Sequence, residues 1–288
     1  MRHVSVRRRV VLLGAAVAVV APLFSGAVGH ADSVGVSATN GKITYQDAWN
    51  PGVVYLADPD GQYPVQIDVG ADIAWAPDGN RYAHTLENSA LVTERIDGSD
   101  RVVLVESPGR KYPAWTADGS AIFYVDDNAL HFVSADGSER GEVFAPEPGL
   151  TIGAPAVAPQ GTIAFDLTTE NLERAIYTYR IGDDEPTLLI EDGGNPDYSP
   201  DGSTLVYEGG SAYDHGIVVA NADGTDPEQL PWYGEAQGNP VWSPDGAFVL
   251  SVAYLRQWSW ITVINVDTDE QRVVASDGFG PVSWQPVP

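Results

Sequence analysis

Trp242-Ser-Pro-Asp-Gly246 decides the fold of this chain, because close copies of it recur along the sequence. The copies are Trp75-Ala-Pro-Asp-Gly79, Trp115-Thr-Ala-Asp-Gly119, Val157-Ala-Pro-Gln-Gly161 and Tyr198-Ser-Pro-Asp-Gly202, and Trp284-Gln-Pro286 is a sixth copy without the turn. Their first residues, at positions 75, 115, 157, 198, 242 and 284, lie 40 to 44 residues apart. A period of this length is typical of repeat architectures and suits a propeller blade of four short strands.

The repeat that begins at Asn239 shows how one period folds. Proline presets the turn at 243–246, and glycine accepts the backbone angles that close it. Around this turn the sequence contains four β-rich runs, at 239–242, 247–252, 260–266 and 271–275. Four such runs separated by turn residues predict one antiparallel blade. The aromatic residue that recurs in each blade is expected to fill the space between neighbouring blades.

The two ends of the repeat region predict how the ring closes. Residues 41–45 and 53–57 match the second and third strands of a blade that lacks a first strand. Residues 281–284 match a first strand with nothing after it. We therefore predict an all-β, six-bladed β-propeller of four-stranded antiparallel blades, closed by pairing of the N- and C-terminal segments. This closure would remove an exposed sheet edge.

The first residues have the pattern of a secretory signal peptide. Arg2 and the arginines at 7–9 precede an apolar run at 10–24, and small residues follow up to Ala31. We predict a signal peptide at 1–31 with cleavage after Ala31, a short linker at 32–40 and the propeller at 41–288. The arginines also partly match a twin-arginine signal, so both export routes stay open. The expected location is extracellular or periplasmic, in the cell envelope.

Composition limits the partners. The chain has 15 Lys and Arg residues against 40 Asp and Glu, a net charge of −25, and removal of the four signal arginines would leave −29. Nucleic acid and anionic membranes are poor partners for such a surface. The absence of cysteine excludes disulfides and thiolate metal sites. After signal cleavage we expect no membrane span, and we expect a monomer.

The motif Asn239-Pro-Val-Trp-Ser-Pro-Asp-Gly246 and its near copy Asn195-Pro-Asp-Tyr-Ser-Pro-Asp-Gly202 resemble the repeat of TolB-type, WD-like six-bladed propellers. The resemblance covers residues 41–288. It implies that the Trp-containing strand is innermost and that the Ser-Pro-Asp-Gly turn joins the first two strands of a blade. The repeat occurs in periplasmic scaffolds, in prolyl peptidases and in some polysaccharide lyases, so it implies a fold rather than an activity.

Two features of TolB-type and peptidase propellers have no counterpart in this sequence. The separate N-terminal α/β domain of TolB finds no match between Asp32 and Gly41, so a Tol-like envelope complex is not expected. No Gly-x-Ser-x-Gly elbow occurs, which argues against a serine peptidase.

The blade pattern sorts the loops into two faces. One face carries the Ser-Pro-Asp-Gly turns and acidic hairpins, where calcium binding is conceivable although Asp-Gly is also an ordinary turn signal. The opposite face carries irregular loops, expected at 46–52, 166–174, 208–215, 230–239 and 253–259, and irregular loops on a rigid scaffold are where binding residues tend to occur. The candidate binding residues are Trp49, Tyr213, Asp214, His215, Trp232, Tyr233, Arg256 and Trp258.

Three functions remain open from the sequence. The first is an exported, non-catalytic propeller that binds a protein or an envelope glycan through exposed aromatic residues of the irregular face. The second is a carbohydrate-active lyase or hydrolase of the propeller type; the resemblance implies a metal held by several histidines, and this would need His84, His131 and His215 to converge. The third is a calcium-stabilised structural module. We predict no catalytic residues and no metal ligands, and no cofactor other than calcium is considered.

Overall fold

The computed structural model describes residues 40–50, 52–86, 89–106, 111–209, 216–231 and 235–287. These residues form an all-β, six-bladed propeller, as the repeats predict. They contain no helix, and so none that could cross a membrane. The predicted signal peptide at 1–31 lies outside the described residues, as does the predicted linker except for Asn40.

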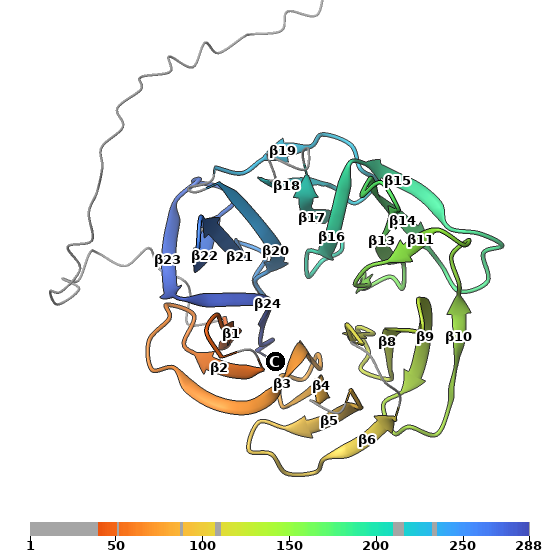
Figure 1. The fold of residues 1–288 in the computed structure, drawn as a ribbon, viewed down its shortest axis with the longest axis horizontal. Helices are drawn as coiled ribbons and strands as arrows, with labels where there is room; N and C mark the ends of the chain where they lie inside the picture. Colours follow the sequence, from red (N-terminus) through yellow and green to blue (C-terminus); the bar gives the residue numbers. More distant parts are fainter. Residues whose placement is uncertain are drawn as a thin grey trace, which may run out of the picture. The chain divides into compact units, whose positions relative to one another are not determined.

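Each blade is an antiparallel sheet whose first strand is innermost (Figure 1). The blades are, from inner to outer strand: blade 1, β24 (Gly278–Trp284), β1 (Ile43–Asp47), β2 (Val53–Ala57) and residues 65–69 of β3 (Val65–Trp75); blade 2, residues 70–75 of β3, β4 (Arg81–Leu86), β5 (Leu91–Arg95) and β6 (Val102–Val105); blade 3, β7 (Ala114–Trp115), β8 (Ala121–Asp126), β9 (Ala129–Ser134) and β10 (Arg140–Phe144); blade 4, β11 (Leu150–Ile152) with β12 (Ala156–Val157), β13 (Ile163–Thr169), β14 (Arg174–Tyr179) and β15 (Thr187–Glu191); blade 5, β16 (Gly193–Tyr198), β17 (Thr204–Gly209), β18 (Gly216–Asn221) and β19 (Glu228–Gln229); blade 6, β20 (Ala236–Trp242), β21 (Phe248–Leu255), β22 (Trp258–Asn265) and β23 (Gln271–Ser276).

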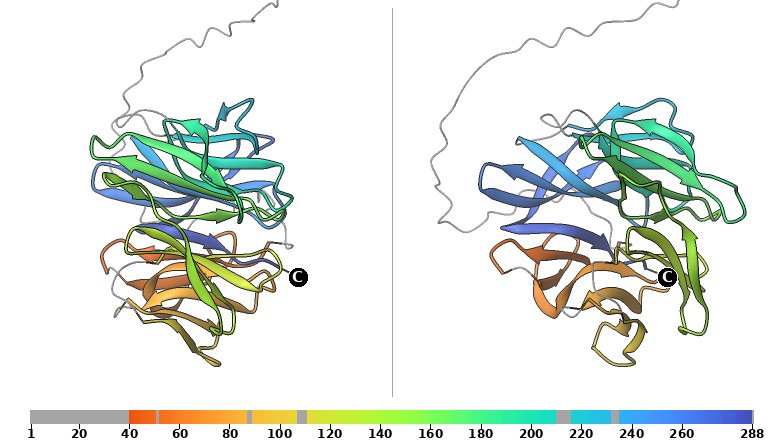
Figure 2. Two further views of the ribbon diagram at one scale, coloured as in Figure 1. Left: turned by 90° about the vertical axis from the view of Figure 1, so that its right-hand side faces the viewer. Right: turned by 45° about the vertical axis from the view of Figure 1, so that its right-hand side comes forward.

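The ring closes as predicted, through pairing of β24 with β1. Ile43 pairs with Trp284 and Thr44 with Ser283, and Gln285 N donates a hydrogen bond to Lys42 O at 2.8 Å. Blade 1 is therefore built from both ends of the described chain. The side views of Figure 2 show the blue strand of the C-terminal end lying against the orange N-terminal strands.

One strand differs from the expected pattern, because β3 serves two blades without an intervening loop. Its first part pairs with β2, from Val65 opposite Leu56 to Val69 opposite Val53. Its second part pairs with β4, from Gly70 opposite Leu86 onward. Blades 1 and 2 consequently form one continuous hydrogen-bonded sheet.

The repeated turns join the first and second strands of the blades, as the resemblance implies. In the turn of blade 6, Gly246 has a φ of 71°, a backbone angle that favours glycine. Asp245 Oδ1 accepts hydrogen bonds from Ser243 Oγ at 2.6 Å and from Ala247 N at 3.0 Å. The side chain of Asn40 donates to Asp245 Oδ2 at 2.8 Å, which anchors the start of the described chain on this turn.

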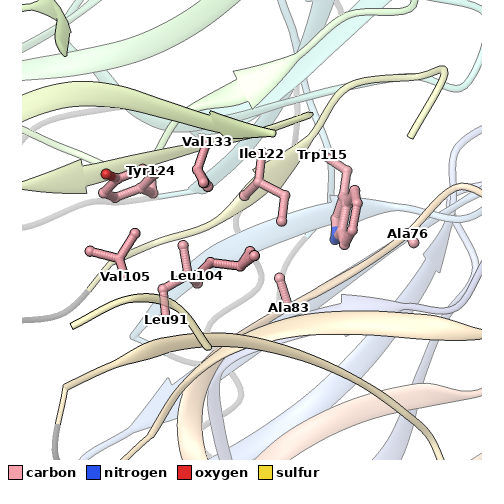
Figure 3. Packing of buried hydrophobic residues seen from close by; sticks show 9 residues of the cluster. All are labelled: Ala76, Ala83, Leu91, Leu104, Val105, Trp115, Ile122, Tyr124 and Val133. Carbon is pink, nitrogen blue, oxygen red and sulfur yellow. The ribbon is translucent and has the colours of Figure 1, made fainter. Parts of the chain in front are cut away.

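The hydrophobic core lies in the spaces between blades. Between blades 2 and 3, for example, Leu91 and Leu104 pack towards Trp115 and Ile122 (Figure 3). Trp115 Nε1 also donates a hydrogen bond to Ala74 O of blade 2 at 3.1 Å. Five of the six blades have an aromatic residue at the first position of the repeat, and all five are buried: Trp75, Trp115, Tyr198, Trp242 and Trp284. Aromatic burial of this kind dominates the packing energy of such cores.

Candidate functional site

The strand directions divide the propeller into two faces. The face that we call the turn face carries the repeated turns together with the hairpins between the third and fourth strands. The face that we call the loop face carries the connections between the second and third strands and the connections between blades. The loop face is where the sequence predicts binding residues.

Two exposed tryptophans meet on the loop face where blade 6 adjoins blade 1. Trp49 lies between β1 and β2 and is 62% exposed, and Trp258 begins β22 and is 46% exposed. Their ring centroids are 6.2 Å apart and their planes meet at 77°, an edge-to-face contact. Such aromatic pairs are favourable beyond the area that they bury. The closing seam of the ring therefore presents a preformed pair of large aromatic side chains.

The loop that carries Trp49 is held by its own residues and by blade 6. Asp47 Oδ1 accepts hydrogen bonds from Trp49 N at 2.8 Å and from Asn50 N at 3.0 Å. Burial opposes ionisation of Asp47, but these hydrogen bonds prevail and hold the pKa of its carboxyl below the usual value. Ala48 N donates to Asp277 O, in the connection that leads into β24, at 2.9 Å. The backbone that presents Trp49 is thus fixed at several points.

The hairpin that carries Trp258 is also tied to its surroundings. Trp258 lies directly opposite Leu255 at the end of the β21–β22 pair. Arg256, in the turn between them, has a φ of 55°, and its backbone N–H donates to Glu235 Oε2 at 3.0 Å. The turn next to Trp258 is therefore held by the carboxylate of Glu235.

Phe279 extends this surface towards the inner strand of blade 1. It lies on β24 opposite Gln46 and is 43% exposed. Its ring meets that of Tyr254 edge to face, with the ring centroids 6.3 Å apart. Burial is the main cause that raises the pKa of Tyr254 to about 12. We call Trp49, Leu255, Trp258 and Phe279 the aromatic patch. Sequence reasoning missed Phe279 because it began the last strand at Pro281, although an aromatic residue between Gly278 and Gly280 could have been noticed.

A cluster of charged residues lies on the same face between blades 4, 5 and 6. Arg174 Nη1 donates to Glu208 Oε2 at 2.7 Å and Arg174 Nη2 to Asp166 Oδ1 at 3.4 Å. Asn195 N donates to Asp166 Oδ1 at 3.0 Å, and Asn239 N donates to Glu208 Oε1 at 2.7 Å. Burial disfavours the charge on Arg174, but the two carboxylates outweigh it and raise the pKa of the guanidinium. The carboxylates thus bind backbone of the next blade and serve to join blades.

The sequence reasoning placed these charges in irregular loops, and the structure corrects this. Asp166 belongs to β13, Arg174 begins β14 and Glu208 lies in β17. The strands run further than expected because the inner strands bulge at Asn195 and Asn239, which leaves backbone N–H groups for the carboxylates. Likewise β20 begins at Ala236, and the loop expected at 253–259 is reduced to the turn between β21 and β22.

The two described histidines lie on different blades. His84 of β4 is buried, with Nε2 at 2.9 Å from Glu94 Oε1. His131 of β9 stacks on Tyr124 with ring centroids 5.4 Å apart. His215 lies outside the described residues. Within the described part of the chain, no group of three or more His, Asp or Glu residues could hold a metal ion.

The structure describes three of the eight predicted binding residues. It brings Trp49, Arg256 and Trp258 together at the seam between blades 6 and 1. Tyr213, Asp214, His215, Trp232 and Tyr233 lie outside the described residues.

A model of the TolB beta propeller domain matches residues 88–286. Among solved structures, TolB from Acinetobacter baumannii is similar with a TM-score of 0.73 and 17% identity, over 85% of this chain and 67% of that chain. No curated protein matches the sequence significantly.

Two further structures share the fold at low sequence identity. A chain of a nidogen/laminin complex has a TM-score of 0.65 at 12% identity, over 85% of this chain and 98% of that chain. An oligogalacturonate lyase in complex with manganese has a TM-score of 0.54 at 17% identity, over 83% of this chain and 74% of that chain. These likenesses show that the fold is shared by an oligogalacturonate lyase and by a chain of a nidogen/laminin complex.

Proposed function

Because the chain belongs to the TolB beta propeller domain family, we propose that it is an exported, non-catalytic propeller that binds a protein or an envelope glycan through the aromatic patch of its loop face. Membership of the family accounts for the scaffold, and the binding role is argued from the aromatic patch. Export to the periplasm or the cell exterior is part of the proposal, supported by the signal-like residues 1–31.

The contact between Trp49 and Trp258 is the observation that carries this proposal. Tryptophan is among the residues most enriched at binding hot spots, and clustered exposed apolar side chains mark interaction surfaces. Both side chains remain about half exposed or more although they touch each other. Their backbones are fixed by the Asp47 and Asp277 contacts, so binding would order little further chain.

The similar chain in the nidogen/laminin complex supports a binding role as one use of this fold. That chain carries a propeller fold within a complex of two named proteins. At 12% identity the likeness says nothing about which partner the present chain would bind, so the proposal depends on the aromatic patch.

The decisive experiment is capture with matched variants. The folded chain, immobilised, is incubated with an envelope extract of its source organism, and retained proteins and glycans are identified. The test variant is Trp49→Ala/Trp258→Ala. The control is Tyr63→Ala/Ile181→Ala, which removes two side chains that are also highly exposed but lie in hairpins of the turn face.

We expect a ligand that the wild type and the control retain and that the test variant loses, while all three proteins melt within a few degrees of one another. Equal retention by the test variant would remove the aromatic patch from consideration. Loss in both variants would show that capture depends on exposed apolar side chains in general.

A further inference from the structure

A second surface, on the turn face, has features of a binding site of different chemistry. A cavity of about 440 Å³ lies between blades 5 and 6. Its floor includes the apolar side chains of Leu230, Trp242 and Val266, and its walls come from the turn that begins at Ser199 and the hairpin between β18 and β19. In Figure 1 these two blades occupy the upper part of the ring, coloured teal to blue.

Two other seams of the ring are bridged at the corresponding place by a glutamine side chain. Gln160 of blade 4 reaches Gly202 O of blade 5 at 3.4 Å, and Gln285 of blade 1 reaches Gly79 O of blade 2 at 2.8 Å. Asp201 stands at the position of Gln160 in the turn of blade 5, as aspartates do in the turns of blades 2, 3 and 6, and accepts hydrogen bonds within its own turn, from Ser199 Oγ at 2.7 Å and Ser203 N at 2.9 Å. Among the described residues, no glutamine bridges the seam between blades 5 and 6 in this way.

The cavity is strongly acidic. Its lining includes four carboxylates, Asp201, Asp226, Glu228 and Asp245, and no lysine or arginine. Hydrogen bonds from Ser199 and Ser203 lower the pKa of Asp201 to about 2, so this group is charged at any physiological pH. Asp226 accepts one hydrogen bond from Asn221 at 3.1 Å. An acidic wall around an apolar floor matches a cation on an aliphatic stem.

We propose that the cavity between blades 5 and 6 binds an extended basic segment of a partner protein. A lysine or arginine stem lies over Leu230 and Trp242, and its charged head lies between Asp226 and Glu228. A divalent metal ion fits less well, because one oxygen each of Asp201 and Asp245 is already used within its turn and much of the lining is apolar. This site is on the opposite face from the aromatic patch and stands independently of it.

The test uses an acetylated and amidated tetralysine peptide as the probe, titrated into the folded chain by calorimetry. The test variant, Asp226→Asn/Glu228→Gln, removes two charges from the cavity. The control, Asp183→Asn/Glu185→Gln, removes two charges from the corresponding hairpin of blade 4, so both variants have the same net charge. Asn at 226 can keep the positive φ of that position and its contact with Asn221.

We expect the test variant to bind tetralysine about tenfold more weakly than the wild type and the control to change by about twofold or less, since two rim ion pairs are lost in one and none in the other. Equal weakening in both variants would overturn the proposal in favour of general attraction by the acidic surface. The proposal would also be overturned if the wild type did not bind tetralysine. A site for calcium instead would show itself if calcium chloride, titrated alone, bound to the wild type and not to the test variant.

Discussion

Deleting residues 281–288 should remove most of the stability of the propeller, because the ring closes through β24. The deletion takes away Val282 and Trp284, which are 4% and 5% exposed. It also removes the hydrogen bonds of Gln285 with Lys42 O and with Gly79 O, both 2.8 Å long. The first described strand, β1, would be left with an unpaired inner edge.

The size of the loss follows from these contacts. Truncating a buried tryptophan costs about 3–5 kcal/mol, a buried valine contributes about 1.5–3 kcal/mol, and each hydrogen bond adds about 0.5–1.5 kcal/mol. The combined loss is about 6–11 kcal/mol, comparable with the whole stability of a natural domain, about 5–15 kcal/mol. The single substitution Trp284→Ala removes about 4 kcal/mol of this, which corresponds to a fall in Tm of about 8–16 °C for a domain of this size.

Thermal unfolding followed by circular dichroism and tryptophan fluorescence provides the assay. We expect no cooperative transition for the truncated chain and a clearly lowered Tm for Trp284→Ala. Trp258→Ala, which removes a tryptophan that is 46% exposed, should melt within about 2 °C of the wild type, since surface substitutions usually change stability by about 0.5 kcal/mol or less. A truncated chain that melts cooperatively near the wild-type Tm would refute the reasoning that closure by β24 carries this stability.

Three further predictions concern buried and supporting carboxylates. Glu208→Ala should lower the free energy of unfolding by about 3 kcal/mol in urea titrations, because the guanidinium of Arg174 loses its closest carboxylate; an unchanged urea midpoint would contradict the role given to Glu208. Burial raises the pKa of Asp197 to about 7, so the folded chain keeps a proton that the unfolded chain releases near pH 4, and stability falls as pH rises from about 4 to 7, by at most about 4 kcal/mol. Asp197→Asn should therefore exceed the wild-type Tm by more at pH 8 than at pH 5, and an equal difference in Tm at both pH values would exclude this linkage. Asp47→Ala removes the acceptor for Trp49 N and Asn50 N. It should clearly reduce the amount of ligand captured while changing Tm little, because the loop that presents Trp49 is no longer held in place; capture equal to that of the wild type would show that Trp49 needs no such support.

Much of the fold could be predicted from sequence because the repeat carries local signals in each blade. The Ser-Pro-Asp-Gly turns combine fixed proline geometry with a glycine at positive φ, as at Gly246, and a burying aromatic residue precedes each turn. The unmatched strands at the two ends then required closure in blade 1, which the pairing of Ile43 with Trp284 confirms. The continuous course of β3 was not predictable in the same way, because the strand passes from one blade to the next at Gly70, a residue more typical of a turn than of a strand interior.

The candidate site could be predicted only where loops carried conspicuous side chains. Trp49 and Trp258 were found because aromatic residues in irregular loops are noticeable, although their contact depends on ring closure. Asp166 and Glu208 were misread as loop residues, since their role depends on backbone N–H groups of a neighbouring blade. The cavity between blades 5 and 6 was not predicted, because its lining comes from turns and hairpins of two blades, segments that are separate in the sequence and come together only in the ring.

The hydrogen bond between Gln285 and Lys42 has a consequence for circular permutation. A short linker could join these neighbours, and new ends could be opened in a hairpin such as the one between β22 and β23, without loss of any strand pair. New ends opened within β3 would instead cut the one continuous sheet shared by blades 1 and 2. The chain can thus begin and end at a turn of another blade while the order of the blades around the ring is kept. Blades 1 and 2, in contrast, must stay joined through β3.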